Sequence, residues 1–265
     1  MKIIFICGSI EPGKDGVGDY TRRLCNELVN KGLTVGILAL SDAYVTKFTE
    51  EKQYSDDHAI PCLRLPKSLK RGMRSDLAAR WVKKYNPEWL SLQFVPYAFN
   101  SKGLPFGLAR ELAFIGGSRK WHIMFHELWI GMSHQSSLKE KLIGYVQKKY
   151  IKDLVLKIKP TVINTQTQLY KKQLFQLGFD VSILPLFSNI PVYNKTVNIE
   201  LPINLKTKYF VLFGAIHHTA PIDSFSKELI AYAKEAPFTL VTIGRNGNEL
   251  DHWISVLKTN GLEII

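Results

Sequence analysis

The sequence has few cysteines and lacks the long apolar run that a membrane-spanning helix requires. None of its 265 residues lies in an uninterrupted apolar stretch of roughly 18 residues. Its three cysteines, Cys7, Cys25 and Cys62, have no metal-ligand spacing, and their odd number argues against a disulfide framework. We therefore expect neither a zinc module nor a disulfide-stapled secreted domain, and the predicted location is the cytoplasm.

Acidic residues are also in the minority. The chain has 35 lysines and arginines against 23 aspartates and glutamates, a net charge of +12, which favours an anionic partner. Two predicted helices, 75–85 and 136–158, carry much of the charge beside apolar residues at helical spacing. Such helices are typical of solvated, core-packed surfaces, and they also suit an anionic membrane surface at the inner face of the membrane. No nucleic-acid-binding motif accompanies the charge, so nucleic acid is not an expected partner.

Apolar strands and amphipathic helices alternate along the first part of the chain. Helices are predicted between Gly18 and Gly32 and at 75–85, 105–115, 136–158 and 168–177. Strands are predicted at 2–7, 34–40, 89–94, 121–125, 161–164 and 181–184. This order predicts an α/β domain with a doubly wound, parallel, Rossmann-like sheet.

The alternation lapses at a segment rich in proline and asparagine and then begins again. Strands are predicted at 209–213 and 238–243, and helices at 224–233 and 249–259. We expect a first Rossmann-like domain over 1–190, a linker over 191–208 and the beginning of a second Rossmann-like domain over 209–265. Because two or three strands have little to pack against, the second domain is expected to be incomplete.

The most informative motif is Gly16-Val17-Gly18-Asp19-Tyr20, which follows the first strand and opens a helix. Free backbone amides and the macrodipole at a helix N-terminus favour a phosphate, a carboxylate or a sugar hydroxyl. The motif therefore predicts a ligand-binding loop. A glycine-rich turn without a ligand is the simpler alternative.

Several segments, in this order, resemble the glycosyltransferases of the GT-B fold, and more closely the family 4 type of retaining, metal-independent enzymes. The segments are Gly16–Leu24, Leu92–Tyr97, Phe125–Leu128, Leu184–Ile190 and Phe213–His217. The resemblance implies transfer of a sugar from a nucleotide-sugar donor with retention, in which the donor phosphate helps to remove the acceptor's proton. It implies no metal and no cofactor besides this co-substrate. The implied acceptor is a sugar or a lipid-linked molecule, as in cell envelope polysaccharide biosynthesis.

The resemblance also assigns roles to single residues. His126, which ends an apolar strand, is the catalytic candidate that contacts the transferred sugar. The remaining donor or acceptor contacts are Gly16, Val17, Gly18, Asp19, Tyr20, Gln93, Tyr97, Glu127, Asn164, Gly214 and Arg245. A packed aromatic at Tyr97 and a structural role for Asn164 are the competing interpretations.

The sequence departs from the family in its second domain. The loop 217–223 lacks the arginine and lysine that hold the donor diphosphate, and Arg245 is the candidate for one missing charge. The family's acidic motif would lie downstream of Ile265. A catalytically inactive binding protein and a nucleotide-sugar epimerase therefore remain alternatives. A dehydrogenase with Asp42 at the ribose is a weaker one, because Thr21 replaces the third glycine of its fingerprint.

Overall fold

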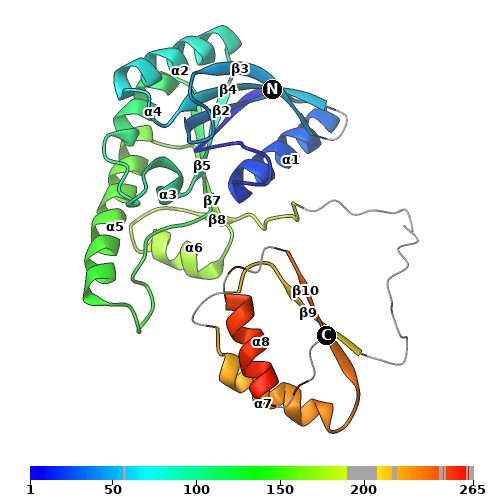
Figure 1. Cartoon of the computed structure of the whole chain (residues 1–265). Helices are drawn as coiled ribbons and strands as arrows, with labels where there is room; N and C mark the ends of the chain where they lie inside the picture. The colour runs from blue at the N-terminus through cyan, green and yellow to red at the C-terminus, as the bar shows by residue number, and fades with distance from the viewer. Residues whose placement is uncertain are drawn as a thin grey trace. The chain divides into compact units, whose positions relative to one another are not determined.

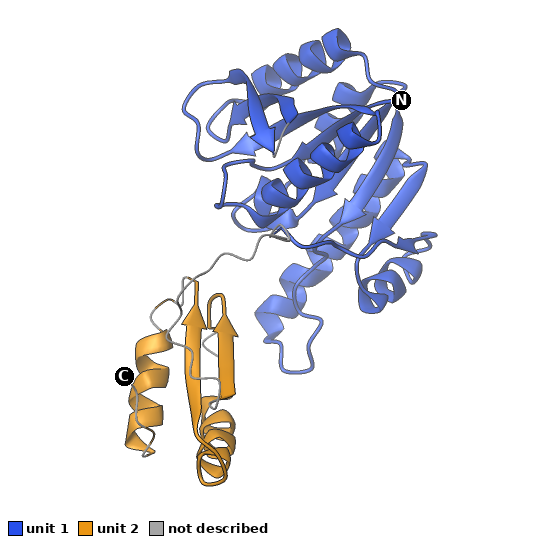
Figure 2. Ribbon diagram, turned by 90° about the vertical axis from the view of Figure 1, so that its right-hand side faces the viewer, with its two compact units in different colours: residues 1–192 blue, residues 193–265 orange. Residues whose placement is uncertain are grey.

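The computed structural model describes residues 1–55, 58–189, 208–216, 220–244, 247, 249–260 and 262. The chain divides into two compact units, residues 1–192 and 193–265 (Figure 2). The predicted linker 191–208 lies outside the described residues except for Lys208, which begins a strand.

An eight-stranded sheet forms the centre of unit 1 within the described residues (Figure 1). Its order is β3-β4-β2-β1-β5-β6-β7-β8, and all neighbours are parallel except β3 and β4. The strands are β1 (Lys2–Cys7), β2 (Thr34–Asp42), β3 (Thr49–Ser55), β4 (His58–Pro66), β5 (Trp89–Phe94), β6 (Lys120–Phe125), β7 (Val162–Thr165) and β8 (Ser182–Ile183). The chain fills the sheet on one side of β1 and then crosses to β5 on the other, so a topological switch point lies between β1 and β5.

Helices cover both faces of this sheet, which explains its continuous apolar strands. The helices are α1 (Gly16–Asn30), α2 (Arg71–Tyr85), α3 (Pro96–Phe99), α4 (Leu108–Gly116), α5 (Leu138–Ile158) and α6 (Gln168–Phe175). Phe5 packs in one apolar cluster with Cys25 of α1, whereas its neighbour Ile6 packs in another with Trp81 of α2 and Leu154 of α5. The predicted doubly wound α/β fold is confirmed.

The β3–β4 hairpin and the single turn of α3 were not predicted from the sequence. Strand β3 alternates half-buried and exposed residues, because it lies at the edge of the sheet and pairs with β4 alone. Its sequence, Thr-Glu-Glu-Lys-Gln-Tyr-Ser, is therefore polar, and β4 contains Pro61. Strand β3 lacks the apolar character of the central strands, so hydrophobic periodicity carried no signal for it. Strand β4 does contribute Ile60, Cys62, Leu63 and Leu65 to the core, but a proline within a run argues against a strand in sequence-based prediction.

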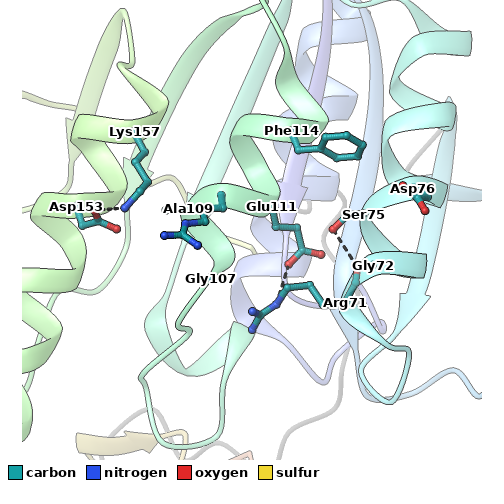
Figure 3. A pocket seen from close by; sticks show the side chains of 11 residues that line it. Arg71, Gly72, Ser75, Asp76, Gly107, Ala109, Glu111, Phe114, Asp153 and Lys157 are labelled. Carbon is teal, nitrogen blue, oxygen red and sulfur yellow. Dashed lines mark hydrogen bonds and ion pairs between the residues drawn. The ribbon is translucent and has the colours of Figure 1, made fainter.

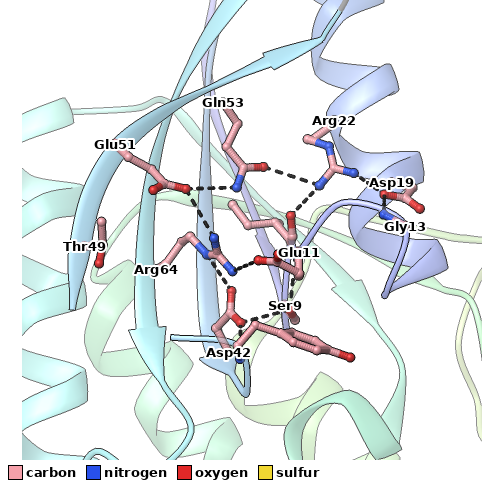
Figure 4. Close-up of polar contacts among 12 residues, drawn as sticks. Ser9, Glu11, Gly13, Asp19, Arg22, Asp42, Thr49, Glu51, Gln53 and Arg64 are labelled. Atoms are coloured by element: carbon pink, nitrogen blue, oxygen red, sulfur yellow. Dashed lines mark hydrogen bonds and ion pairs between the residues drawn. The ribbon is translucent and has the colours of Figure 1, made fainter. Parts of the chain in front are cut away.

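The hairpin supplies Arg64, a buried arginine that joins three segments (Figure 4). Its guanidinium donates to Asp42 Oδ2 at 2.8 Å in β2 and to Glu11 Oε2 at 2.6 Å in the loop after β1. It also lies 3.4 Å from Glu51 Oε1 in β3. Ser9 donates to the other oxygen of Asp42 at 3.1 Å. Asp42 is fully buried and both of its carboxylate oxygens are engaged within the protein, which argues against the ribose-binding role considered for it.

Unit 2 contains the parallel strands β9 (Lys208–Phe213) and β10 (Phe238–Ile243) with helices α7 (Ile222–Ala233) and α8 (Glu249–Thr259). Leu229 of α7 and Trp253 of α8 form its core with apolar side chains of the strands. A cavity of about 440 Å³ lies between these helices and the strands. Val211 and Phe213 of β9 remain exposed.

The three cysteines are buried and free. Burial raises the pKa of the Cys62 thiol to about 12, so it stays protonated and unreactive at neutral pH. Within the described part of the chain, no helix is both long enough and apolar enough to span a bilayer.

Replacing Arg64 by methionine tests how strongly its ion pairs hold the loop after β1. Arg64→Met leaves the buried Asp42 carboxylate without its cation, so we expect a loss of about 3 to 5 kcal/mol in the free energy of unfolding. The matched control is Lys84→Met, which removes an exposed ion pair of 3.0 Å to Glu50 and is expected to cost at most about 1 kcal/mol. Urea unfolding measures both, and equal small losses would contradict the prediction.

Candidate active site

The candidate site lies where the chain leaves the carboxyl ends of β1, β5 and β6. The loop after β1 and helix α3 after β5 touch at the switch point. A Cβ atom on Gly8 would lie 2.6 Å from the Cβ atom of Ala98 in α3, a distance that real side chains do not reach. Gly8 therefore allows the two segments to meet, and the neighbouring strand ends bring the remaining site residues beside them.

Helix α1 begins at Gly16, so the motif Gly16–Tyr20 is the first part of a helix and not the loop that we expected. Asp15 is its N-cap residue, and its Oδ1 accepts a hydrogen bond of 2.8 Å from the Gly18 amide. Burial raises the pKa of this carboxyl, while the Gly18 and Val17 amides lower it. The protein's own carboxylate thus occupies the amides predicted to bind an anion, and a ligand phosphate would have to displace it.

The two glycines of the motif differ in their surroundings. A Cβ atom on Gly18 would lie 2.6 Å from the backbone oxygen of Ser9, whereas one on Gly16 would meet nothing within 4 Å. The Gly16 oxygen accepts a hydrogen bond of 3.0 Å from the Asn189 side chain. Gly18 therefore serves the packing of α1 against the loop, while the prediction that both contact a ligand stays a prediction.

Tyr20 connects α1 to the opposite part of the site. Its buried ring lies 5.2 Å from the ring of His126 in an edge-on arrangement. It also stacks on Phe187 at 4.7 Å. Phe187 follows β8, and sequence analysis did not assign it to the site. The motif and the catalytic candidate are therefore brought together, with a third segment beside them.

His126 directly follows β6, as predicted, and is held at both its backbone and its ring. Its amide donates to the Phe94 oxygen at 3.0 Å, and its own oxygen accepts from Gln166 Nε2 at 2.8 Å. The ring Nε2 lies 2.9 Å from Gln93 Oε1. Burial, and next the neighbouring His122, lowers the pKa of His126 to about 4. The imidazole is therefore neutral at physiological pH.

A line of polar side chains leads from His126 across three strands. Gln93 Nε2 donates to Ser91 Oγ at 2.8 Å, and Ser91 Oγ lies 2.7 Å from His122 Nδ1. His122 Nε2 lies 3.1 Å from Asn164 Oδ1 in β7. These residues alternate with apolar ones of the α2-side cluster, such as Leu92, so they share the other face of the sheet. Gln93 and Asn164 were expected contacts, whereas Ser91 and His122 were missed, although polar residues inside apolar strands are a usable signal.

The other predicted residues make no hydrogen bond or ring contact with His126 within the part of the chain that the structure describes. Glu127 directly follows His126, and its side chain is exposed. Burial, and next the charge of Glu127, raises the pKa of Tyr170. Tyr97 accepts a long hydrogen bond of 3.5 Å from Gln147 in α5. Gly214 follows β9 of unit 2 and has a positive φ of 89°. Arg245 and residues 217–219 lie outside the described residues.

A hollow of about 570 Å³ opens among α2, α4 and α5 of unit 1, and none of the predicted site residues lines it (Figure 3). At its base the buried Glu111 accepts two hydrogen bonds of 2.8 Å from Arg74. Three cations balance three anions on its wall: Arg71, Arg110 and Lys157 against Asp76, Glu111 and Asp153. Because the opposite charges are equal in number, the lining of this hollow favours neither an anionic nor a cationic ligand. Among the described residues, no group of three or more histidine, cysteine or acidic side chains is placed to hold a metal ion.

No family model and no curated protein sequence matches the chain. Solved structures do match it, covering nearly the whole of this chain. The GtfA/B complex matches with a TM-score of 0.57 and 10% identity over 99% of this chain and 75% of that chain. A glycosyltransferase from Rickettsia africae matches with a TM-score of 0.56 and 14% identity over 98% of this chain and 64% of its own.

The catalytic domain of starch synthase IV from Arabidopsis thaliana, bound to ADP and acarbose, matches with a TM-score of 0.52 and 11% identity over 98% of this chain and 72% of that chain. The chain thus has the GT-B fold of glycosyltransferases, as predicted. It spans somewhat less than two thirds of the Rickettsia chain.

The two glycines of α1 provide a matched pair of substitutions. Gly18→Ala places a methyl group against the Ser9 backbone, and we expect it to lower the free energy of unfolding by about 1 to 3 kcal/mol. Gly16→Ala meets no atom and improves helix propensity, so its effect should lie between zero and about 1 kcal/mol of stabilisation. Denaturant unfolding of both variants measures the difference. Equal stability of the two would refute the packing role of Gly18.

Proposed function

We propose that the protein transfers a glycosyl group from a nucleotide-sugar donor to an acceptor hydroxyl. The observation that carries the proposal is the position of His126 beside Tyr20, at the carboxyl ends of the strands next to the switch point. Ligands of open α/β sheets bind at such a point. The fold shared with glycosyltransferases, one of them holding ADP and acarbose, adds support.

In the proposed reaction an acceptor oxygen bonds to the anomeric carbon while the bond from that carbon to the diphosphate oxygen breaks. The acceptor's proton passes to the departing diphosphate. Charge develops at the anomeric carbon and on the leaving oxygen, and fixed dipoles stabilise such charge best where water is excluded. We extend the proposal to retention of configuration, without a metal or a further cofactor, on the strength of the resemblance to family 4 enzymes.

Unit 2 is assigned to the donor in this proposal. Gly214 and Gly244 follow β9 and β10 with φ values of 89° and 109°, and the Gly214 amide donates to the Ile243 oxygen at 2.8 Å. Glycines at neighbouring strand ends permit close approach of a ligand to the backbone. Arg245, next in the sequence, is the proposed partner of the diphosphate.

A panel of nucleotide sugars tests the proposal by calorimetric binding and by detection of free nucleoside diphosphate and glycosylated product. We expect one donor to bind, and His126→Ala to lower kcat/KM about 100-fold, a loss typical of a removed transition-state contact. The control His134→Ala changes an exposed histidine and should leave kcat/KM unaltered.

Each alternative predicts a different result. A donor that binds without turnover would favour an inactive binding protein, and isomerisation of the donor sugar without transfer would favour an epimerase. If no nucleotide sugar binds, the proposed function is wrong.

We also propose that one end of α5 contacts an anionic membrane surface. The buried residues of α5 begin at Gly144, whereas Leu138, Leu142 and Tyr145 are 85%, 66% and 55% exposed. Their spacing of four and three residues places them on one face of the helix. Lysines flank them at 139, 141, 148 and 149. An exposed apolar face among basic residues favours an interfacial helix, and a lipid-linked acceptor of cell envelope synthesis is the substrate that it suits.

The other basic helix does not share this feature, because Trp81 and Val82 of α2 are buried in the core of unit 1. Its lysines and arginines are therefore those of a core-packed helix with a solvated face. This difference limits the membrane proposal to α5.

Vesicle sedimentation tests the contact. We expect the protein to bind vesicles that contain anionic lipid at least tenfold more tightly than neutral ones, and added salt should weaken binding because it screens the lysines. Leu138→Ser combined with Leu142→Ser should weaken binding by tenfold or more. Leu156→Ser, which alters an exposed leucine near the other end of α5, is the control. Equal binding to both vesicle types would contradict the proposal.

A further inference from the structure

The polar residues beside His126 form a hydrogen-bond chain. Which atom donates at each link is determined at the end away from His126, where Asn164 meets the Ser182 backbone oxygen. We infer that Asn164, His122, Ser91 and Gln93 are positioning residues that hold the proton of His126 on Nε2 and leave its Nδ1 lone pair to accept a hydrogen bond from a substrate hydroxyl. The identity of that hydroxyl, a hydroxyl of the sugar or acceptor, rests on the proposed function; the direction of the chain does not.

The direction begins at a backbone carbonyl, which can only accept hydrogen bonds. The Ser182 oxygen in β8 lies 3.1 Å from Asn164 Nδ2, which must donate to it. The opposite amide orientation would place two oxygen atoms against each other. Asn164 Oδ1 therefore faces His122 Nε2 at 3.1 Å, and this nitrogen carries the proton.

The constraint passes from His122 to Gln93 in two steps. Burial lowers the pKa of His122 to about 4, so the ring is neutral and its Nδ1 is an acceptor. Ser91 must then donate its hydroxyl proton to that nitrogen at 2.7 Å. The Ser91 oxygen is left to accept from Gln93 Nε2 at 2.8 Å.

The chain ends at the catalytic candidate. With its nitrogen committed to Ser91, Gln93 presents Oε1 to His126 Nε2 at 2.9 Å, and an oxygen in this position requires an N–H partner. His126 Nδ1 makes no hydrogen bond to any residue that the structure describes. Edge-on contact with Tyr20 restrains the ring.

A neutral ring with a free acceptor has a definite ligand preference. Its lone pair attracts the proton of a hydroxyl and repels the oxygens of a phosphate. His126 is therefore suited to orient a hydroxyl-bearing substrate, whereas the diphosphate must be held elsewhere. Gln93 is accordingly a positioning residue in this arrangement, although the resemblance implied direct ligand contact for it.

Nitrogen-15 NMR of the full chain labelled on histidine tests the inference without any ligand, with His126→Gln to assign the signals. We expect His126 to be protonated at Nε2 in the unaltered protein. In Ser91→Ala the Gln93 amide loses its acceptor and is free to turn, so the His126 proton should redistribute toward Nδ1. Ser91→Thr keeps a hydroxyl and should restore the original signals.

Ser41→Ala is the matched control, because Ser41 is equally buried in the same sheet and its hydroxyl has no partner among the described residues. It should leave the His126 signals unchanged. If Ser91→Ala fails to fold, Asn164→Ala breaks the same chain at a half-buried position. Protonation of His126 at Nδ1 in the unaltered protein, or identical signals in the folded chain-breaking variant, would overturn the inference.

Kinetics separate this inference from the proposed function. With an active donor and acceptor, Ser91→Ala should lower kcat/KM about tenfold, Ser91→Thr should restore it and Ser41→Ala should not change it. Nε2 protonation that responds to Ser91→Ala in a protein that binds no nucleotide sugar would support the chain and refute the proposed function. Sugar transfer by a protein with His126 protonated at Nδ1 would support the proposed function and refute the hydrogen-bond chain.

Discussion

The reversal of strand order between β1 and β5 is the constraint on which the rest of unit 1 depends. Because the chain leaves these neighbouring strands toward opposite sides of the sheet, their loops separate and leave a place for a ligand at the carboxyl edge. The absence of a side chain at Gly8 lets the loop after β1 lie against Ala98, so the two sides still meet at their base. Helix α1 and His126 then take their positions beside this junction.

The two halves of the α1-side sheet face have different chemistry. Over β1, β2 and β4, the α1-side face is mostly apolar and packs with α1, with the buried Arg64 near the carboxyl end of β4. Over β5, β6 and β7, the same face carries Ser91, Gln93, His122 and Asn164. Buried polar groups require partners, and these four provide them for one another. A directional chain of this kind is therefore compatible with a stable sheet and places a neutral histidine at its end.

Charged side chains of the site lie around the loop after β1. Arg64 holds Glu11 and Asp42, while Asp15 caps α1, so the loop after β1 is held by the protein's own carboxylates. An anion at this loop would therefore have to compete with carboxylates that are already in place. This competition agrees with the proposal that groups outside the surroundings of His126 hold the diphosphate of the donor.

The central strands and the main helices of both units were predictable because their apolar periodicity is local: β5 and β10 fall where the sequence places them. His126 and Gln93 were predictable as residues near strand ends. Strand β3 was not, because an edge strand with polar residues has no hydrophobic signal. The Asp15 cap also escaped prediction, since its hydrogen bond depends on where α1 begins.

By itself the sequence thus determined the α/β alternation and the candidates at strand ends. Only the tertiary structure decided which of those candidates meet. Ser91 and His122 are 31 residues apart in the chain and become partners because parallel pairing of β5 and β6 places them opposite each other. Register and side-chain direction are properties of paired strands, which is why a single strand's sequence does not contain them.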